Sequence, residues 1–282
     1  MANNTEIFVS ERHKFTFPLS GSLSLRVYSN TRPYIWQIAN LQKGLILVNR
    51  EVEIVGEGTG FGVPVVLYSD ERYFSGSSKV YLFQQKDSVI IRKEFFMDMV
   101  PRKKFRGINL HNQKLRILSR YLAKLYQSHR RFPLLLVKRL LLNLGFNTSF
   151  ERTTPIGKVI IVYTVRKKRI YVESDFRNLK KKNLKRIFLL NEHGSKYFRR
   201  YSDTNNTLLV DRQIGAWEKV EAEWASITDL QGRIGFRLWN LENSILRRGR
   251  EYLKNCLDWI GLDYEVDPES TCFDYMIDLI GV

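Results

Sequence analysis

Short runs of β-branched and aromatic residues, separated by turn residues, recur along the first third of the chain. Runs of this kind are too short for helices, and strands at such close spacing are typical of an all-β sandwich or barrel. We therefore expect a large β-sandwich. The expected strands are Phe15–Phe17, Leu23–Tyr28, Tyr34–Ile38, Leu45–Val48, Glu51–Val55, Val63–Tyr68, Val80–Gln84 and Val89–Arg92, with a tight turn at Asn49-Arg50.

The pattern changes to helical spacing in the middle of the chain. Between residues 112 and 128 the leucines share one side of a helical wheel, while Arg116, Arg120 and Lys124 share the other. A second helix is expected to begin at Pro133 and end at Gly145. The region 102–150 is thus predicted to be a basic helical hairpin inserted into the sandwich.

Strands are expected to return after Pro155, as three hairpins followed by one more helix. This last helix is predicted from Ser244 to Gly261, and a final strand from Thr271 to Ile280. No linker or repeat divides the chain, so we expect one large β-rich domain over 1–282, α+β overall. The hairpins are Val159–Val165 with Ile170–Glu173, Leu184–Leu190 with Lys196–Tyr201, and Glu218–Ile227 with Arg233–Trp239.

The formal net charge of +17 is unevenly distributed. Residues 1–91 carry +1, residues 92–200 carry +23 and residues 201–282 carry −7. Solubility alone needs only interspersed charges. A localised positive field attracts polyanions, because their binding releases condensed counterions.

The central basic residues therefore predict a surface that contacts phosphates rather than reads bases, since no recognition helix is identifiable. Nucleic acid is the leading partner class. The candidate binding residues are Arg102, Lys103, Lys104, Arg106, Arg116, Arg120, Lys124, Arg130, Arg131, Arg166, Lys167, Lys168, Arg169, Lys180, Lys181 and Lys182.

Two other patterns are weaker candidates for a site. The glycine-rich segment Gly56–Gly62 precedes a predicted strand, so it indicates a bend rather than a phosphate loop, which would open a helix. Glu221 and Glu223 alternate between Trp217 and Trp224. Two carboxylates on one strand face could flank a glycosidic bond, although such a pair is more often the solvated face of a sheet.

Other classes of site and location find no support in the sequence. The histidines, among them His193 in the second expected turn, are scattered singly, so we expect neither a metal site nor a cofactor. The first residues lack the apolar core of a signal peptide, and no apolar run is long enough to span a membrane. A cytoplasmic protein without a membrane partner is therefore expected.

A faint resemblance adds a fold-level expectation. Lys43-Gly44-Leu45, the segment from Gly56 to Val65, Glu221–Trp224 and Gly235-Phe236-Arg237 resemble archaeal proteins of the galactose-mutarotase-like supersandwich type. The resemblance covers about a third of the chain and implies a large two-sheet architecture and a relationship to carbohydrate-active proteins. It carries over no catalytic residue, because neither Glu221 nor Glu223 has a clear histidine partner.

Three functions stay open on this reading. The first is a non-enzymatic protein that binds a polyanion through the central basic segment. The second is a carbohydrate-active or carbohydrate-binding protein that uses a groove near Gly58–Gly62 with Glu221 and Glu223. The third is a structural homo-oligomer in which the basic and acidic blocks pair.

Overall fold

The computed structural model describes residues 7–9, 14–29, 41–56, 58–85, 87–105, 108–109, 146–253 and 257–282. Within these ranges the chain is built from antiparallel strands and one short 3-10 helix, η1 (Asp211–Ile214), and contains no α-helix. The β-rich sandwich is confirmed in this sense, but the expected α+β class is wrong.

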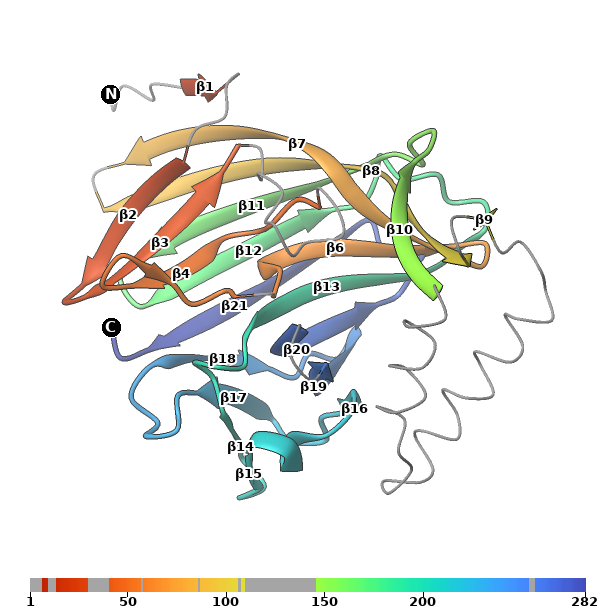
Figure 1. Ribbon diagram of the computed structural model, residues 1–282. Coiled ribbons are helices and arrows are strands. Elements are labelled where there is room, and N and C mark those ends of the chain that lie inside the picture. The colour runs from red at the N-terminus through yellow and green to blue at the C-terminus, as the bar shows by residue number, and fades with distance from the viewer. Residues whose placement is uncertain are drawn as a thin grey trace.

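Most strands belong to one pairing network of 17 strands that is folded into two layers (Figure 1). We call the first layer the large sheet. Its strands are β1 (Ile7–Val9), β7 (Glu71–Gln85), β8 (Ser88–Phe105), β9 (Ile108–Asn109), β10 (Phe146–Arg152), β11 (Lys158–Arg166), β12 (Arg169–Asp175), β14 (Arg200–Asp203), β15 (Leu208–Val210), β17 (Trp224–Thr228), β18 (Gly235–Trp239) and β21 (Cys272–Ile280).

The second layer, which we call the facing sheet, is joined to the first through β7. Residues 71–73 of β7 pair with β6, whereas residues 74–85 pair with β8. The register shifts at this corner around Gly76, where a Cβ atom would lie 2.4 Å from Met99 Cγ. The facing sheet consists of β6 (Gly60–Tyr68), β13 (Leu184–Gly194), β16 (Glu218–Lys219), β19 (Ser244–Leu253) and β20 (Leu257–Val266).

A separate four-stranded sheet extends the second layer beside β6. An isolated bridge between Leu45 and Phe61 connects the two. The tight turn expected at Asn49-Arg50 is present one residue later, at Arg50 and Glu51. These two residues have φ angles of 46° and 66°, and Asn49 pairs with Val52. The sheet consists of β2 (Lys14–Ser20), β3 (Leu23–Tyr28), β4 (Ile46–Asn49) and β5 (Val52–Glu53).

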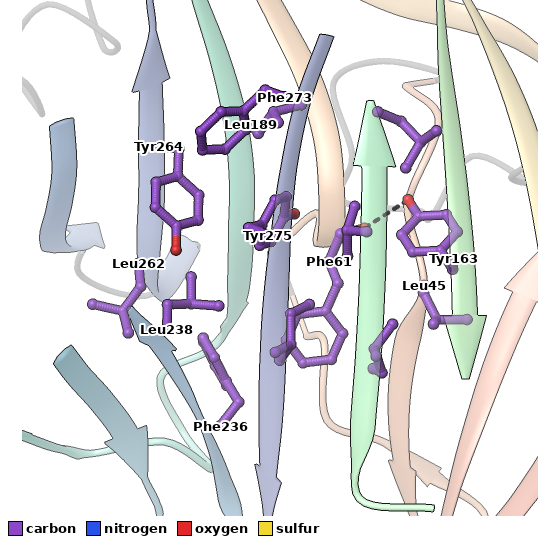
Figure 2. Close-up of a cluster of buried hydrophobic side chains, with 14 of the residues drawn as sticks. Leu45, Phe61, Tyr163, Leu189, Phe236, Leu238, Leu262, Tyr264, Phe273 and Tyr275 are labelled. Carbon is purple, nitrogen blue, oxygen red and sulfur yellow. Dashed lines mark hydrogen bonds between the residues drawn. The ribbon is translucent and has the colours of Figure 1, made fainter. Parts of the chain in front are cut away.

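The core lies between the two layers, and one cluster of buried apolar side chains includes residues from Leu23 to Leu279. Figure 2 shows Tyr163 from the large sheet pointing toward Phe61 of β6, to whose carbonyl oxygen its hydroxyl donates a hydrogen bond of 2.9 Å. Tyr264 and Tyr275 fill the space between the layers in the same way. This packing fixes the orientation of the large sheet, so that alternate side chains of each strand point away from the core.

The helix expected from Ser244 to Gly261 is wrong. The segment instead forms β19 and β20, which pair along their whole length. Gly249 and Gly261 face each other across this pair, and a Cβ atom at Gly249 would lie 2.5 Å from the indole ring of Trp217. The glycines therefore accommodate a tryptophan from elsewhere in the sequence, which the local pattern does not reveal.

The helices expected at 112–128 and 133–145 lie outside the described residues. The ends of the expected helical insertion are strands, however, because residues 102–105 belong to β8 and residues 146–150 belong to β10. The expected strand Tyr34–Ile38 also lies outside the described residues.

The expected hairpins had mixed outcomes. The hairpin around Arg166–Arg169 is confirmed as β11 and β12. The one ending at Trp239 is present as β17 and β18, but its first strand begins at Trp224 rather than Glu218, because Glu218 and Lys219 form β16 and pair with β19. The final strand is confirmed as β21. The hairpin around Asn191–Gly194 is wrong, because β13 continues through Gly194 and pairs with β6 and β20.

Candidate polyanion interface

The large sheet exposes one face to the outside, which we call the outer face. Along β11, β12 and β21, buried residues alternate with exposed or half-exposed ones. Because successive side chains of a strand point to opposite faces of the sheet, the exposed and half-exposed residues all lie on this outer face. The strand registers then place these residues in rows that run across the sheet.

One row of the outer face is apolar and aromatic, and we call it the aromatic row. Its first members are direct cross-strand partners, namely Phe83, Ile90, Thr164, Tyr171 and Met276. The row continues to Trp239 and its partner Trp224. Tyr171 is 37% exposed, and the other six are half-buried.

A second row next to it is basic, and we call it the arginine row. Arg166 is the partner of Arg169, and Asp278 of β21 lies between Arg169 and Arg237. The Nε atom of Arg169 is 3.1 Å from Asp278 Oδ1, and the indole nitrogen of Trp239 donates to Asp278 Oδ2 at 3.2 Å. The Arg237 guanidinium lies over the Trp224 ring, 3.9 Å from its centroid. One carboxylate thus links the two rows.

The hairpin tip extends the arginine row beyond the sheet. Lys167 and Lys168 form a two-residue turn between Arg166 and Arg169, and Lys167 has a φ of 48°. All four side chains are exposed. This end of the outer face therefore holds five cationic side chains, counting Arg237, around the carboxylate of Asp278.

The other candidate binding residues with described side chains lie outside the arginine row, and two of them already contact groups within the protein. Arg102 pairs with Glu71 and lies 3.8 Å from Glu151. Lys181 donates to the carbonyl oxygens of Pro268 and Ser270, both at 2.8 Å. Lys180 and Lys182 are exposed in the loop that follows β12, at the end of that strand away from the Arg166–Arg169 tip.

The side chains of the remaining candidates are outside the described part of the structure. Lys103 and Lys104 lie in β8, and only the backbone of these two residues is described. The others lie outside the described residues, and they are Arg106, Arg116, Arg120, Lys124, Arg130 and Arg131. The segment 110–145, which contains most of them, carries eight Lys or Arg and no Asp or Glu. In the sequence it follows β9 and precedes β10, both of which pair with β8 (Figure 1).

The basic and acidic blocks of the sequence meet within one chain. Arg169 pairs with Asp278, Arg186 with Glu265 at 2.9 Å, and Arg199 with Asp211 at 2.6 Å. Pairing of the two blocks between copies of the chain stays a prediction.

The two candidate catalytic carboxylates lie just before β17, and Glu223 immediately precedes Trp224 of the aromatic row. Glu221 and Glu223 are both exposed, on either side of the buried Ala222. Glu221 forms an ion pair with Lys219 at 3.1 Å. The Gly56–Gly62 segment packs instead on β13, where a Cβ atom at Gly58 would lie 2.4 Å from the Glu192 carbonyl oxygen. The glycine segment and the two carboxylates are therefore not shown to share a groove.

Sequence reasoning missed a buried polar group on β13. Asp263 accepts a hydrogen bond from the Asn191 backbone N–H at 2.8 Å, and the Asn191 amide oxygen accepts from Tyr275 at 2.9 Å. Burial, and then the charge of Glu251, raises the pKa of Glu192 to about 8. Burial, and then the neighbouring Glu192, also raises the pKa of Asp263. The sequence pattern predicts a turn at Asn191 and Glu192, but both residues lie in β13.

His193 is fully buried on the same strand rather than in a turn. It is enclosed by Phe61, Phe198 and Phe236, with ring centroids 4.4–5.5 Å away, and neither ring nitrogen has a hydrogen-bond partner. Burial lowers its pKa to about 3, so the imidazole is neutral at physiological pH. The alternation Ile187, Leu189, Asn191, His193 could have indicated a continuing strand.

Neither a metal centre nor a membrane span was found in the part of the chain that the structure describes. No group of three or more His, Cys, Asp or Glu in it is arranged to hold a metal ion. No helix there is long and apolar enough to cross a bilayer.

Comparison with known proteins identifies no family for this chain. No family model and no curated protein matches this chain. Among solved structures, the Slr1438 protein from Synechocystis sp. PCC 6803 is similar over 99% of both chains, at 8% identity and a TM-score of 0.39. The resemblance to galactose-mutarotase-like proteins stays a prediction.

Proposed function

We propose that this protein binds single-stranded nucleic acid on the outer face of the large sheet. The observation that carries the proposal is the arrangement of the aromatic row beside the arginine row. Aromatic side chains on a sheet can stack on unpaired bases, and a neighbouring line of cationic side chains can follow the phosphates. Base stacking of this kind contributes about 1–3 kcal/mol per base.

The dimensions of the face support a single strand rather than a duplex. From Tyr171 on β12 to Trp224 on β17 there are three inter-strand steps, or roughly 14 Å at about 4.8 Å per step. A duplex hides the faces of its bases, so it could not use Tyr171 as a stacking partner. Stacking is sequence-tolerant, which agrees with phosphate contact as the main source of affinity.

The acidic residues on the same face limit where the strand would lie. Glu173 and Asp274 are partners in the row next to the aromatic row, on the side away from Arg169. They would repel phosphates. The strand would therefore pass along the Arg166–Arg169 tip and Arg237, with its bases directed toward Tyr171 and Trp239.

Fluorescence anisotropy with labelled oligonucleotides tests this function. We expect binding of single-stranded DNA and RNA that weakens steeply with salt; with four phosphates neutralised, log Kobs should fall with log[salt] at a slope of roughly −3. Duplex DNA and an acidic polysaccharide of equal charge should bind less tightly. Equal affinity for all of these polymers, or no salt dependence, would contradict the proposal.

A further inference from the structure

A second cationic site shares no residue with the aromatic row or the arginine row. It is a pocket of about 750 Å³ formed by the segment after β13, by η1 and by Arg250 of β19. This volume lies within the range of about 300–1,000 Å³ of small-molecule sites. Four cationic side chains and one carboxylate line it, namely Lys196, Arg199, Arg212, Arg250 and Asp211.

Asp211 holds two of the arginines in place. Its Oδ1 and Oδ2 atoms accept from Nε and Nη2 of Arg199 at 2.8 and 2.6 Å, and Oδ1 also accepts from Nη1 of Arg250 at 3.2 Å. The contact uses two of the five N–H donors of Arg199. A single carboxylate therefore orients two guanidinium groups.

The backbone fixes Asp211 in this position. Asp211 has a φ of 51°, a left-handed conformation that is uncommon for a residue other than glycine. Its N–H donates to the Arg199 carbonyl oxygen at 2.8 Å, and the preceding Val210 N–H donates to Gln213 Oε1 at 3.1 Å. Such conformations are strained and occur more often at functional sites.

Arg250 is the deepest cation of the pocket. Its side chain is only 10% exposed, its Nη2 atom lies 3.4 Å from the Ser195 hydroxyl, and its backbone N–H donates to Gly215. Lys196 and Arg212 are exposed at the rim. A ligand that enters would meet the rim cations first and the oriented guanidinium groups next.

We propose that this pocket binds a small ligand through a phosphate group. A planar guanidinium can donate two parallel hydrogen bonds to two oxygens of a phosphate, which a monatomic anion cannot accept. The lining, with four cationic side chains and one carboxylate, suits a dianion. The hydroxyl of Ser195 supplies a further possible donor. This site is distinct from the nucleic-acid surface, because none of its lining residues belongs to the aromatic row or the arginine row.

Isothermal titration calorimetry with inorganic phosphate and pyrophosphate, at ionic strength held constant with NaCl, tests the site. We expect saturable binding to the wild-type protein, at least tenfold weaker binding to Lys196→Gln/Arg212→Gln, and no change for the matched control Lys180→Gln/Lys182→Gln. The rim variant should also bind single-stranded oligonucleotides as the wild type does, which separates this site from the outer face.

Three results would overturn the phosphate site. They are no detectable heat with either anion, equal affinity in the rim variant and the wild type, and equal weakening by the control variant. A second variant, Arg199→Gln, should weaken binding by a larger factor, and its circular dichroism spectrum would show whether the fold is retained. Full affinity in a folded Arg199→Gln protein would also contradict the proposal.

Discussion

The Arg237 guanidinium lies 3.9 Å from the centroid of the Trp224 indole ring, and the two residues come from neighbouring strands of the large sheet. A cation held over an aromatic face is attracted by the ring quadrupole. The contact holds Arg237 against the sheet beside Asp278, which is its cross-strand partner. The arginine therefore reaches the outer face in a defined orientation.

Replacing Arg237 with lysine tests the value of this orientation. Arg237→Lys keeps the charge but loses the planar group, so we expect single-strand affinity to fall about three- to tenfold, which corresponds to roughly 0.7–1.4 kcal/mol. Arg233→Lys, in the exposed turn before β18, is the matched control and should bind as the wild type does. Anisotropy titration at fixed salt gives both values, and an equal loss in the two variants would count against a specific role.

Tyr171 is the most exposed ring of the aromatic row. We expect Tyr171→Ala to weaken oligonucleotide binding by about tenfold, because one stacked base is worth about 1–3 kcal/mol. The change should leave the thermal midpoint nearly unaltered, since the side chain is 37% exposed. Tyr197 is similarly exposed, at 41%, and lies outside the row. If Tyr197→Ala were as damaging as Tyr171→Ala, the aromatic row would not be the binding site.

Lys93 is fully buried, and its ammonium donates to the carbonyl oxygens of Tyr28 and Lys43 at 2.9 and 2.6 Å. Burial lowers its pKa from 10.5 to about 7. Between these values the unfolded chain binds more protons than the folded one, so this group makes stability rise with pH from about 7 to 10.5. Lys93→Met should remove that rise.

Urea unfolding at several pH values measures the effect of Lys93. The difference between wild type and Lys93→Met should change by a few kcal/mol across the window. The exposed Lys79, on the neighbouring strand β7, supplies the control Lys79→Met. A constant difference between wild type and Lys93→Met at every pH would show that Lys93 titrates normally.

Titration of Glu192 has the opposite effect on stability to titration of Lys93. Burial raises its pKa from 4.5 to about 8, so the folded chain holds the extra proton between these values and stability falls as pH rises through this window. Glu192→Gln lacks this titration. The stability of the variant relative to the wild type should therefore increase from pH 4.5 to pH 8, by an amount on the order of a few kcal/mol.

Thermal unfolding across this pH range is the measurement for Glu192. Glu173→Gln replaces an exposed carboxylate on the outer face and should show no such trend. Parallel pH profiles for wild type and Glu192→Gln would mean that the Glu192 carboxyl is charged and solvated near neutral pH.

The elements predicted correctly from the sequence are those fixed by local signals. The hairpin at Arg166–Arg169 follows from alternating apolar residues on both sides of a polar turn, and the turn between β4 and β5 follows, to within one residue, from its short connection. β19 and β20 could not be predicted in this way, because Gly249 and Gly261 accommodate Trp217, which is distant in sequence. The charged and amide residues at the end of β13 suggested a turn, although they lie in a buried strand.

The arrangement of the candidate site was less accessible still. The basic tip was recognised from four consecutive cationic residues. Its relation to Arg237 and Trp224 depends on β21 lying between β12 and β18, which is a pairing of distant segments. Local sequence patterns contain no information on such registers, so the aromatic row could be found only from the structure.

Photo-crosslinking tests the central claim most directly. A single-stranded oligothymidylate carrying 5-iodouracil would be irradiated on the protein, and the linked peptides identified by mass spectrometry. We predict crosslinks to Tyr171, Trp224 or Trp239, and their yield should decrease with added salt. In the Tyr171→Ala variant, the crosslink at position 171 should be lost. Crosslinks found only at sites away from the outer face, such as Tyr197, would contradict the account.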